Sequence, residues 1–566
     1  MGKLNHKVIV LSAVIVIFSG ACSVEPPGQA VLTPPLTAPE QESLLQDTDV
    51  TLREEAGQQR GQVTDVRVNR PQSKLRMDRY AAMPATGMAQ IRAPSEPVNR
   101  ENYAHFSDNP LQRVADDPFS TFSIDVDTGA YSNMRRLLNA GSRPPKDAIR
   151  TEELINYFSY DYPRPNNRAT PFSITTEVGP SPWNGDTQLL HIGIQGYDVP
   201  RAQLPAANLV FLVDVSGSMR SPDKLELLKS ALRLLVRELK AADRVSMVVY
   251  AGASGVVLEP TAGDQAATIS MALDGLTAGG STNGGAGIRM AYALAQQAFI
   301  KDGINRVILA TDGDFNVGMV DFEMLKQLVE ERREHGIGLT TLGFGSGNYN
   351  DHLMEQLADA GNGNYAYIDT LSEARKALVD EMSSTLLTIA KDVKIQVEFN
   401  PATVAEYRLI GYENRALARE DFSNDRVDAG DIGAGHSVTA IYEIALTGSA
   451  GQRLDGGRYQ RQPRSTGNSG ELALVRLRYK PPQGDSSKLI ERPVRKADII
   501  NRIELATDRY RFAAAVAGFG QLLRGGKYTA DFAYPEVLML ARGARGDDPF
   551  GYRGEFLQLA NLASSL

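Results

Sequence analysis

Cysteine is almost absent from this sequence: the 566 residues include one, Cys22. A single thiol cannot form an intramolecular disulfide or a cysteine-rich metal site. Histidine is also scarce, with six residues scattered along the chain and no pair at a spacing typical of metal ligands. Any metal site in this protein must therefore be built from other ligand types.

The sequence also lacks a basic region. The formal net charge is −8, the pI is about 5.5, and no block of lysine and arginine stands out. Because binding to nucleic acid needs a basic face, nucleic acid is not an expected partner. The length predicts roughly three or four domains, and the hydrophobic fraction of 42% is enough for a large core.

One hydrophobic run lies near the N-terminus. Positive residues precede "VIVLSAVIVIF" (8–18), and the small residues of "SGACS" follow it. This run is too short to span a bilayer, and the pattern is typical of a secretory signal peptide over residues 1–22. No other hydrophobic segment is long enough to cross a membrane.

The end of this segment resembles a bacterial lipobox, with Ser19 where that motif usually has leucine. The resemblance implies that Cys22 is lipid-modified and anchors the protein in the cell envelope. In a Gram-negative source, the absence of aspartate after Cys22 implies the outer membrane, facing the periplasm. The alternative is an ordinary signal peptide cut near Ala21.

Residues 23–100 are rich in proline, glutamine and charged residues and have little sustained periodicity. Such a segment buries too little apolar area to offset its ordering entropy. We therefore expect a disordered tether above the membrane.

From about residue 205 to 385, apolar runs alternate with amphipathic segments. "NLVFLVDVS" is a continuous apolar run, as expected for a strand covered on both faces, and "KLELLKSALRLLVREL" places leucines on one helical stripe. Further alternation of this kind predicts an α/β fold with a mostly parallel, Rossmann-like sheet wrapped by helices.

The regions on either side have a different pattern. Residues 101–204 contain a predicted helix followed by strands, residues 386–485 are rich in alternating apolar positions, and residues 486–566 are helical in pattern. We expect the β-rich parts to form one sandwich, with the α/β region inserted between them.

Three polar clusters follow strands of the predicted α/β sheet. They are Asp214, Ser216 and Ser218; Ser281 and Thr282 in a glycine-rich loop; and Asp312 and Asp314 in "ATDGDFN". Ligand sites in such sheets lie at the carboxyl ends of the strands, so these groups are expected to meet there, except Asp314, which we expect to face solvent. Hard oxygen ligands favour Mg²⁺, Mn²⁺ or Ca²⁺ over zinc. The alternative is that these groups only cap helices and turns.

This ordered set resembles the metal-ion-dependent adhesion site of von Willebrand factor type A domains. The resemblance implies that Ser216, Ser218 and Thr282 bind the ion directly, and that Asp214 and Asp312 hold its water ligands. It further implies that a partner protein completes the coordination with an aspartate or glutamate carboxylate. The segments "DDPFSTFSIDVDTGAYSNMRRLLNAG" and "LATDGDFNVG" also resemble bacterial YfbK-like lipoproteins.

The segment "FSIDVDTGAY" superficially resembles the start of haloacid-dehalogenase-type phosphatases, with Asp125 as nucleophile and Asp127 as general acid. The strand–helix sheet that such an enzyme needs does not follow, and no histidine lies in the three polar clusters to activate a serine. We therefore expect a non-enzymatic, envelope-anchored protein that binds a protein partner through a divalent cation. The alternatives are a structural scaffold with an incidental metal site, and a phosphatase.

Overall fold

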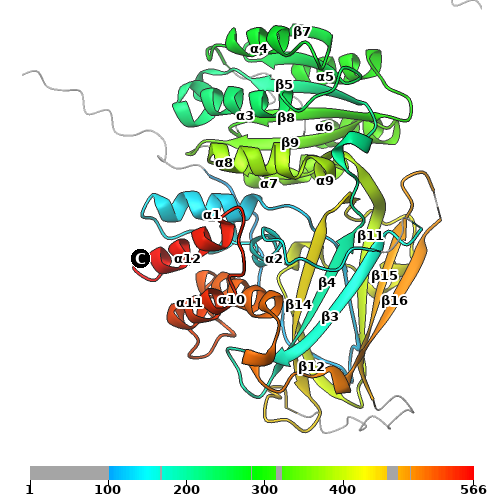
Figure 1. The fold of residues 1–566 in the computed structure, drawn as a ribbon, viewed down its shortest axis with the longest axis vertical. Helices are drawn as coiled ribbons and strands as arrows, with labels where there is room; N and C mark the ends of the chain where they lie inside the picture. The colour runs from blue at the N-terminus through cyan, green and yellow to red at the C-terminus, as the bar shows by residue number, and fades with distance from the viewer. Residues whose placement is uncertain are drawn as a thin grey trace, which may run out of the picture. The chain divides into compact units, whose positions relative to one another are not determined.

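The computed structural model describes residues 101–165, 169–281, 284–313, 322–347, 349–455, 470–484 and 486–566. They all belong to one compact unit of the chain. Figure 1 shows its two strand-rich regions and its group of helices.

The α/β region contains a six-stranded sheet with the strand order β10-β9-β8-β5-β6-β7. Five of its strands run parallel, and the edge strand β7 is antiparallel to β6. The bounds are β5 (Ala207–Asp214), β6 (Arg244–Tyr250), β7 (Ser254–Ala262), β8 (Ile304–Thr311), β9 (Gly338–Phe344) and β10 (Tyr365–Ile368). The mostly parallel sheet predicted from the sequence is confirmed.

Helices cover both faces of this sheet (Figure 1). Every residue of β5 is buried: Leu209 and Phe211 pack in the same cluster as α3, whereas Leu212 packs with α5 and α6. The helices are α3 (Leu227–Val236), α4 (Ala266–Asp274), α5 (Gly284–Gln297), α6 (Phe322–Glu334), α7 (Asp351–Ala360), α8 (Leu371–Arg375) and α9 (Met382–Leu386). Three further short helical segments are the 3₁₀ helix η3 (Gly217–Arg220) and the π-helices η4 (Pro222–Glu226) and η5 (Lys376–Asp380). This two-sided burial explains why the strand has a continuous apolar sequence.

The β-rich region consists of two mainly antiparallel sheets. One has the order β1-β12-β14-β4-β3; the other has the order β13-β11-β15-β16, with β2 also paired to β11. The strands that precede the α/β region are β1 (Gln112–Arg113), β2 (Phe119–Ser123), β3 (Phe172–Pro180) and β4 (Gln188–Gly196). Those that follow it are β11 (Thr388–Phe399), β12 (Val404–Ile410), β13 (Ile432–Gly433), β14 (Ser437–Leu446), β15 (Glu471–Lys480) and β16 (Lys488–Arg495).

Strands from both sides of the α/β region pair in these sheets. β2 pairs with β11 and β4 pairs with β14, both antiparallel. Ring contacts connect the two sheets: Phe399 stacks on Tyr407 with centroids 4.4 Å apart, and Phe172 meets Tyr479 at 5.3 Å. The two β-rich segments therefore share one core.

A separate helical core contains α1 (Gly129–Asn139), α2 (Thr151–Asn156), α10 (Asp508–Leu523), α11 (Tyr534–Gly543) and α12 (Tyr552–Ala563). The apolar helix α10 is buried along most of its length, which confirms the helical C-terminal region. No helix in the described ranges is long and apolar enough to span a bilayer.

Candidate metal site

Asp214 is the last residue of β5 and is fully buried. Its Oδ1 accepts a hydrogen bond from the backbone N–H of Ser216 at 2.8 Å. Its Oδ2 accepts bonds from Thr311 Oγ1 at 2.9 Å and from Tyr250 OH at 3.3 Å. The carboxylate is therefore held by donors from the ends of β6 and β8 and from the loop that follows β5.

Ser216 and Ser218 project together from this loop, with their Oγ atoms 3.0 Å apart. The glycine-rich loop lies against it, because Gly217 donates its N–H to Gly280 O at 3.0 Å and Gly279 donates to Val215 O at 2.7 Å. A Cβ at Gly217 would lie 3.3 Å from that carbonyl oxygen, so the close approach favours glycine there. The structure thus brings the first cluster and the start of the second together.

Asp312, which follows β8 directly, is also fully buried. Its Oδ2 accepts a hydrogen bond from Lys224 Nζ, 2.8 Å away. Lys224 belongs to η4 and is 6% exposed. No local pattern indicates this ion pair, because the two residues are 88 positions apart and Lys224 begins a segment that looks like an ordinary amphipathic helix. Thr311 was not among the predicted site residues either. Its position at the end of the strand, directly before Asp312, could have identified it.

Burial raises the pKa of Asp214 to about 6, and the hydrogen bonds from Ser216 and Thr311 oppose that rise. A nearby cation would favour the ionised form of such a carboxyl group. The oxygen atoms gathered at this strand end are hydroxyls of serine, threonine and tyrosine and the carboxylates of Asp214 and Asp312, and such oxygens suit a hard divalent ion. Because both oxygens of Asp214 already accept protein hydrogen bonds, its position fits a carboxylate that orients ligands rather than one that binds an ion directly.

Several predicted residues lie outside the described ranges. Thr282 and Asp314 fall within their gaps, and Cys22, the predicted signal peptide and the predicted tether precede residue 101. The roles assigned to them remain predictions.

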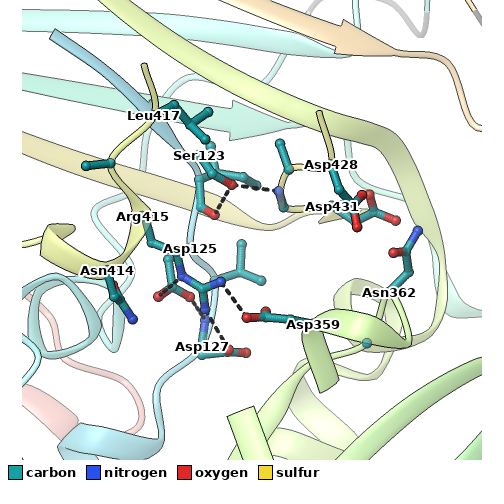
Figure 2. Close-up of a pocket in the computed structure, with 16 residues that line it drawn as sticks. Ser123, Asp125, Asp127, Asp359, Asn362, Asn414, Arg415, Leu417, Asp428 and Asp431 are labelled. Atoms are coloured by element: carbon teal, nitrogen blue, oxygen red, sulfur yellow. Dashed lines mark hydrogen bonds and ion pairs between the residues drawn. The ribbon is translucent and has the colours of Figure 1, made fainter. Parts of the chain in front are cut away.

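A second polar cluster surrounds Asp125 and Asp127, which follow β2. Figure 2 shows the guanidinium of Arg415 between these two aspartates and Asp359. Arg415 Nε donates to Asp125 Oδ2 at 3.1 Å and Nη1 donates to Asp359 Oδ2 at 2.7 Å, while Asp127 lies 3.6 Å from Nη2. These residues line a cavity of about 250 Å³. The side chain of Asp125 is 1% exposed, and its carboxylate is already paired with the guanidinium of Arg415 in this conformation.

Three carboxylates of this cluster, from Asp125, Glu153 and Glu355, offer oxygens within 4.8 Å of one another. Two arginines already neutralise them: Arg150 pairs with Glu153 and lies 3.4 Å from Glu355, and Arg415 donates to Glu355 at 3.1 Å. Burial and neighbouring carboxylates raise the pKa of Glu153 to about 8, although Arg150 opposes the shift. The cluster therefore resembles an internal ion-pair network more than a metal site.

Three family models match the chain. The model described as von Willebrand factor type A domain matches residues 209–314, the model described as von Willebrand factor matches residues 97–191, and the model described as uncharacterized protein YfbK, C-terminal, matches residues 384–566. The first of these covers both Asp214 and Asp312.

The chain is also similar to individual proteins. The chain is 48% identical over 472 residues to uncharacterized protein YfbK of Escherichia coli (strain K12), which covers 82% of this chain and 81% of that protein. It is 26% identical over 263 residues to inter-alpha-trypsin inhibitor heavy chain H3 of Mesocricetus auratus, over 42% of this chain and 29% of that protein. A solved structure, von Willebrand factor type A from Catenulispora acidiphila, is 16% identical, covers 70% of this chain and 91% of its own, and has a TM-score of 0.38.

Proposed function

We propose, from the premise that this chain belongs to the YfbK family and carries a von Willebrand factor type A domain, that it is a cation-dependent protein-binding module of the cell envelope. The observation that carries the proposal is the assembly of Asp214, Ser216 and Ser218 at the tip of β5, beside Asp312. Domains of this type commonly mediate protein–protein interaction.

In the proposal, Ser216, Ser218 and Thr282 would hold the divalent ion, and Asp214 and Asp312 would orient its water ligands. The bound ion would supply a Lewis-acidic position that attracts an aspartate or glutamate carboxylate of a partner. Mg²⁺ or Mn²⁺ suits this oxygen-rich set, and Ca²⁺ is the third candidate. The role of the protein is to orient the hydroxyls and to keep the two aspartates buried.

Capture of partners from solubilised envelope tests the proposal. The parent protein should retain a partner in Mg²⁺ and release it in EDTA, and Asp214→Ala should capture none. The matched control is Asp223→Asn, because Asp223 is an exposed carboxylate close in sequence to the site. Capture that is unaffected by EDTA and by Asp214→Ala would favour a structural scaffold instead.

We further propose that Cys22 carries the lipid anchor, on the basis of the signal-like segment before it. Cys22→Ala should move the protein from the membrane fraction to the soluble envelope fraction. If the variant still fractionates with membranes as the parent does, the anchor lies elsewhere. In a Gram-negative source, sucrose-gradient separation should place the parent in the outer membrane.

A further inference from the structure

Lys224 brings a positive charge into the candidate metal site. Its Nζ lies 2.8 Å from Oδ2 of Asp312, one of the two carboxylates that the proposed function assigns to the ion's water ligands. Both residues are buried, at 6% and 0% exposure. Burial strengthens electrostatic interactions. The charge of Lys224 therefore interacts with the groups of the site more strongly than the charge of an exposed lysine would.

The side chain of Lys224 reaches the site by packing along the loop that follows β9. Its aliphatic stem crosses Gly345, the residue after β9: a Cβ there would lie 2.2 Å from Lys224 Cε and 2.4 Å from Cγ. Gly345 also has a φ of +75°, a conformation that strongly favours glycine. Its carbonyl oxygen accepts a hydrogen bond from Tyr367 OH, which helps to fix the loop. Lys224 is therefore guided towards Asp312 by segments that follow β5 and β9.

We propose that Lys224 couples cation binding at this site to the binding of an anionic ligand; this inference rests on the proposed function. With Asp214 and Asp312 ionised and Lys224 protonated, the three side chains carry one net negative charge. A divalent ion then leaves one net positive charge, which a single carboxylate neutralises. Without the lysine charge, the ion alone would balance the site, and the electrostatic attraction for a carboxylate would be weaker.

Two consequences follow from this charge balance. The ammonium group weakens cation binding when no anion is present, because like charges repel across a short, poorly solvated distance. It also attracts a carboxylate to the loaded site. Cation and carboxylate must therefore raise each other's affinity, since such coupling is reciprocal.

The test is a calorimetric titration of the purified chain with Mn²⁺, in the absence and presence of excess acetate. In the parent, acetate should tighten Mn²⁺ binding. Lys224→Gln, which keeps a hydrogen-bond donor but removes the charge that repels the cation, should bind Mn²⁺ alone about 10-fold more tightly and gain less from acetate. Lys224→Arg keeps the charge and should retain the acetate effect.

The outcomes separate this inference from the proposed function. Parent-like Mn²⁺ affinity and a parent-like acetate effect in a folded Lys224→Gln protein would overturn the role of Lys224 and leave the metal site standing. Tighter Mn²⁺ binding by Lys224→Gln than by the parent, with a smaller acetate effect, would support the inference. No binding by any variant would overturn both proposals. Circular dichroism and the thermal midpoint establish which variants are folded. If Lys224→Gln fails to fold, Lys224→Met takes its place. Loss of the acetate effect in folded Lys224→Met would support the inference, and a parent-like acetate effect in that variant would overturn it.

Discussion

Asp214 is the last residue of a strand in which every residue is buried. Its carboxyl group nevertheless accepts hydrogen bonds from three donors. The backbone of Ser216 and the hydroxyls of Thr311 and Tyr250 fix its orientation. Burial nevertheless raises its pKa to about 6. A residue placed in this way is costly to ionise without a cation nearby, which distinguishes it from an ordinary turn aspartate.

His191 illustrates the opposite case, a buried ionisable group that serves the core. It lies on β4, is 2% exposed, and its Nε2 is 2.7 Å from Tyr162 OH. Burial, with a smaller contribution from Arg509, lowers its pKa from 6.5 to about 3. Below pH 6.5 the unfolded chain therefore binds a proton that the folded chain does not bind until about pH 3.

The free energy of unfolding should therefore fall as the pH drops from 6.5 towards 3. Between pH 7 and pH 4.5 this group should contribute a loss on the order of 2 kcal/mol, and His191→Gln should remove that part of the pH dependence. Urea denaturation at the two pH values measures it. His335→Gln, at an exposed position, is the control. An unchanged pH dependence in His191→Gln would contradict this account.

At the scale of secondary structure, apolar patterning predicted most elements of the α/β region. The continuous apolar runs became the buried strands β5 and β8, because helices cover both faces of the sheet. The antiparallel edge strand β7 was not predicted: Val256 and Val257 are exposed, so the strand has no clear two-residue alternation. An edge strand is specified mainly by its pairing with β6, which a local pattern does not show.

The residues of the candidate site were likewise predictable only where a local sequence pattern groups them. Asp214, Ser216 and Ser218 follow one strand, so local sequence is enough to group them. The pairing of Lys224 with Asp312, and of Arg415 with Asp125, joins segments far apart in the chain. Such contacts depend on the tertiary fold, and local sequence carries no signal for them.

Arg415 connects three elements, and its removal should have a large effect. It follows β12, and its partners are Asp125 in the segment after β2 and Asp359 in α7. Arg415→Met would leave several buried carboxylates without their counter-ion and should lower the free energy of unfolding by about 3–5 kcal/mol. Urea denaturation at pH 7 measures the change.

The control for Arg415 is Arg502→Met. Arg502 is 70% exposed and pairs only with another exposed residue, Glu504, in the described contacts. Its replacement should change the free energy of unfolding by less than about 0.5 kcal/mol. Equal effects of the two substitutions would show that the ion pairs of Arg415 add little to stability.

At the scale of the whole molecule, the α/β region interrupts a β-rich region whose strands come from both sides of it. The pairs β2–β11 and β4–β14 join residues more than 240 positions apart. Each β-rich segment on its own would lack the partner strands that cover its hydrophobic side. Folding of this region therefore depends on both segments.

This topology predicts how fragments should behave. Residues 205–384 should fold alone, because the six-stranded sheet is complete within them. A fragment of residues 391–481 should be unstable, since it lacks β2 and β4. Thermal melts followed by circular dichroism check both statements. Cooperative unfolding of the 391–481 fragment would show that the earlier strands are dispensable.

The central claim is that the oxygens at the tip of β5 form a divalent-cation site, and calorimetric titration with Mg²⁺ tests it most directly. The parent and Asp223→Asn should give equal binding heats. Asp214→Ala should remain folded, because the apolar residues Leu209–Val213 still pack in the core, and should bind Mg²⁺ about 10–100-fold more weakly. Equal affinities for the parent and Asp214→Ala, or no heat from the parent, would contradict the claim.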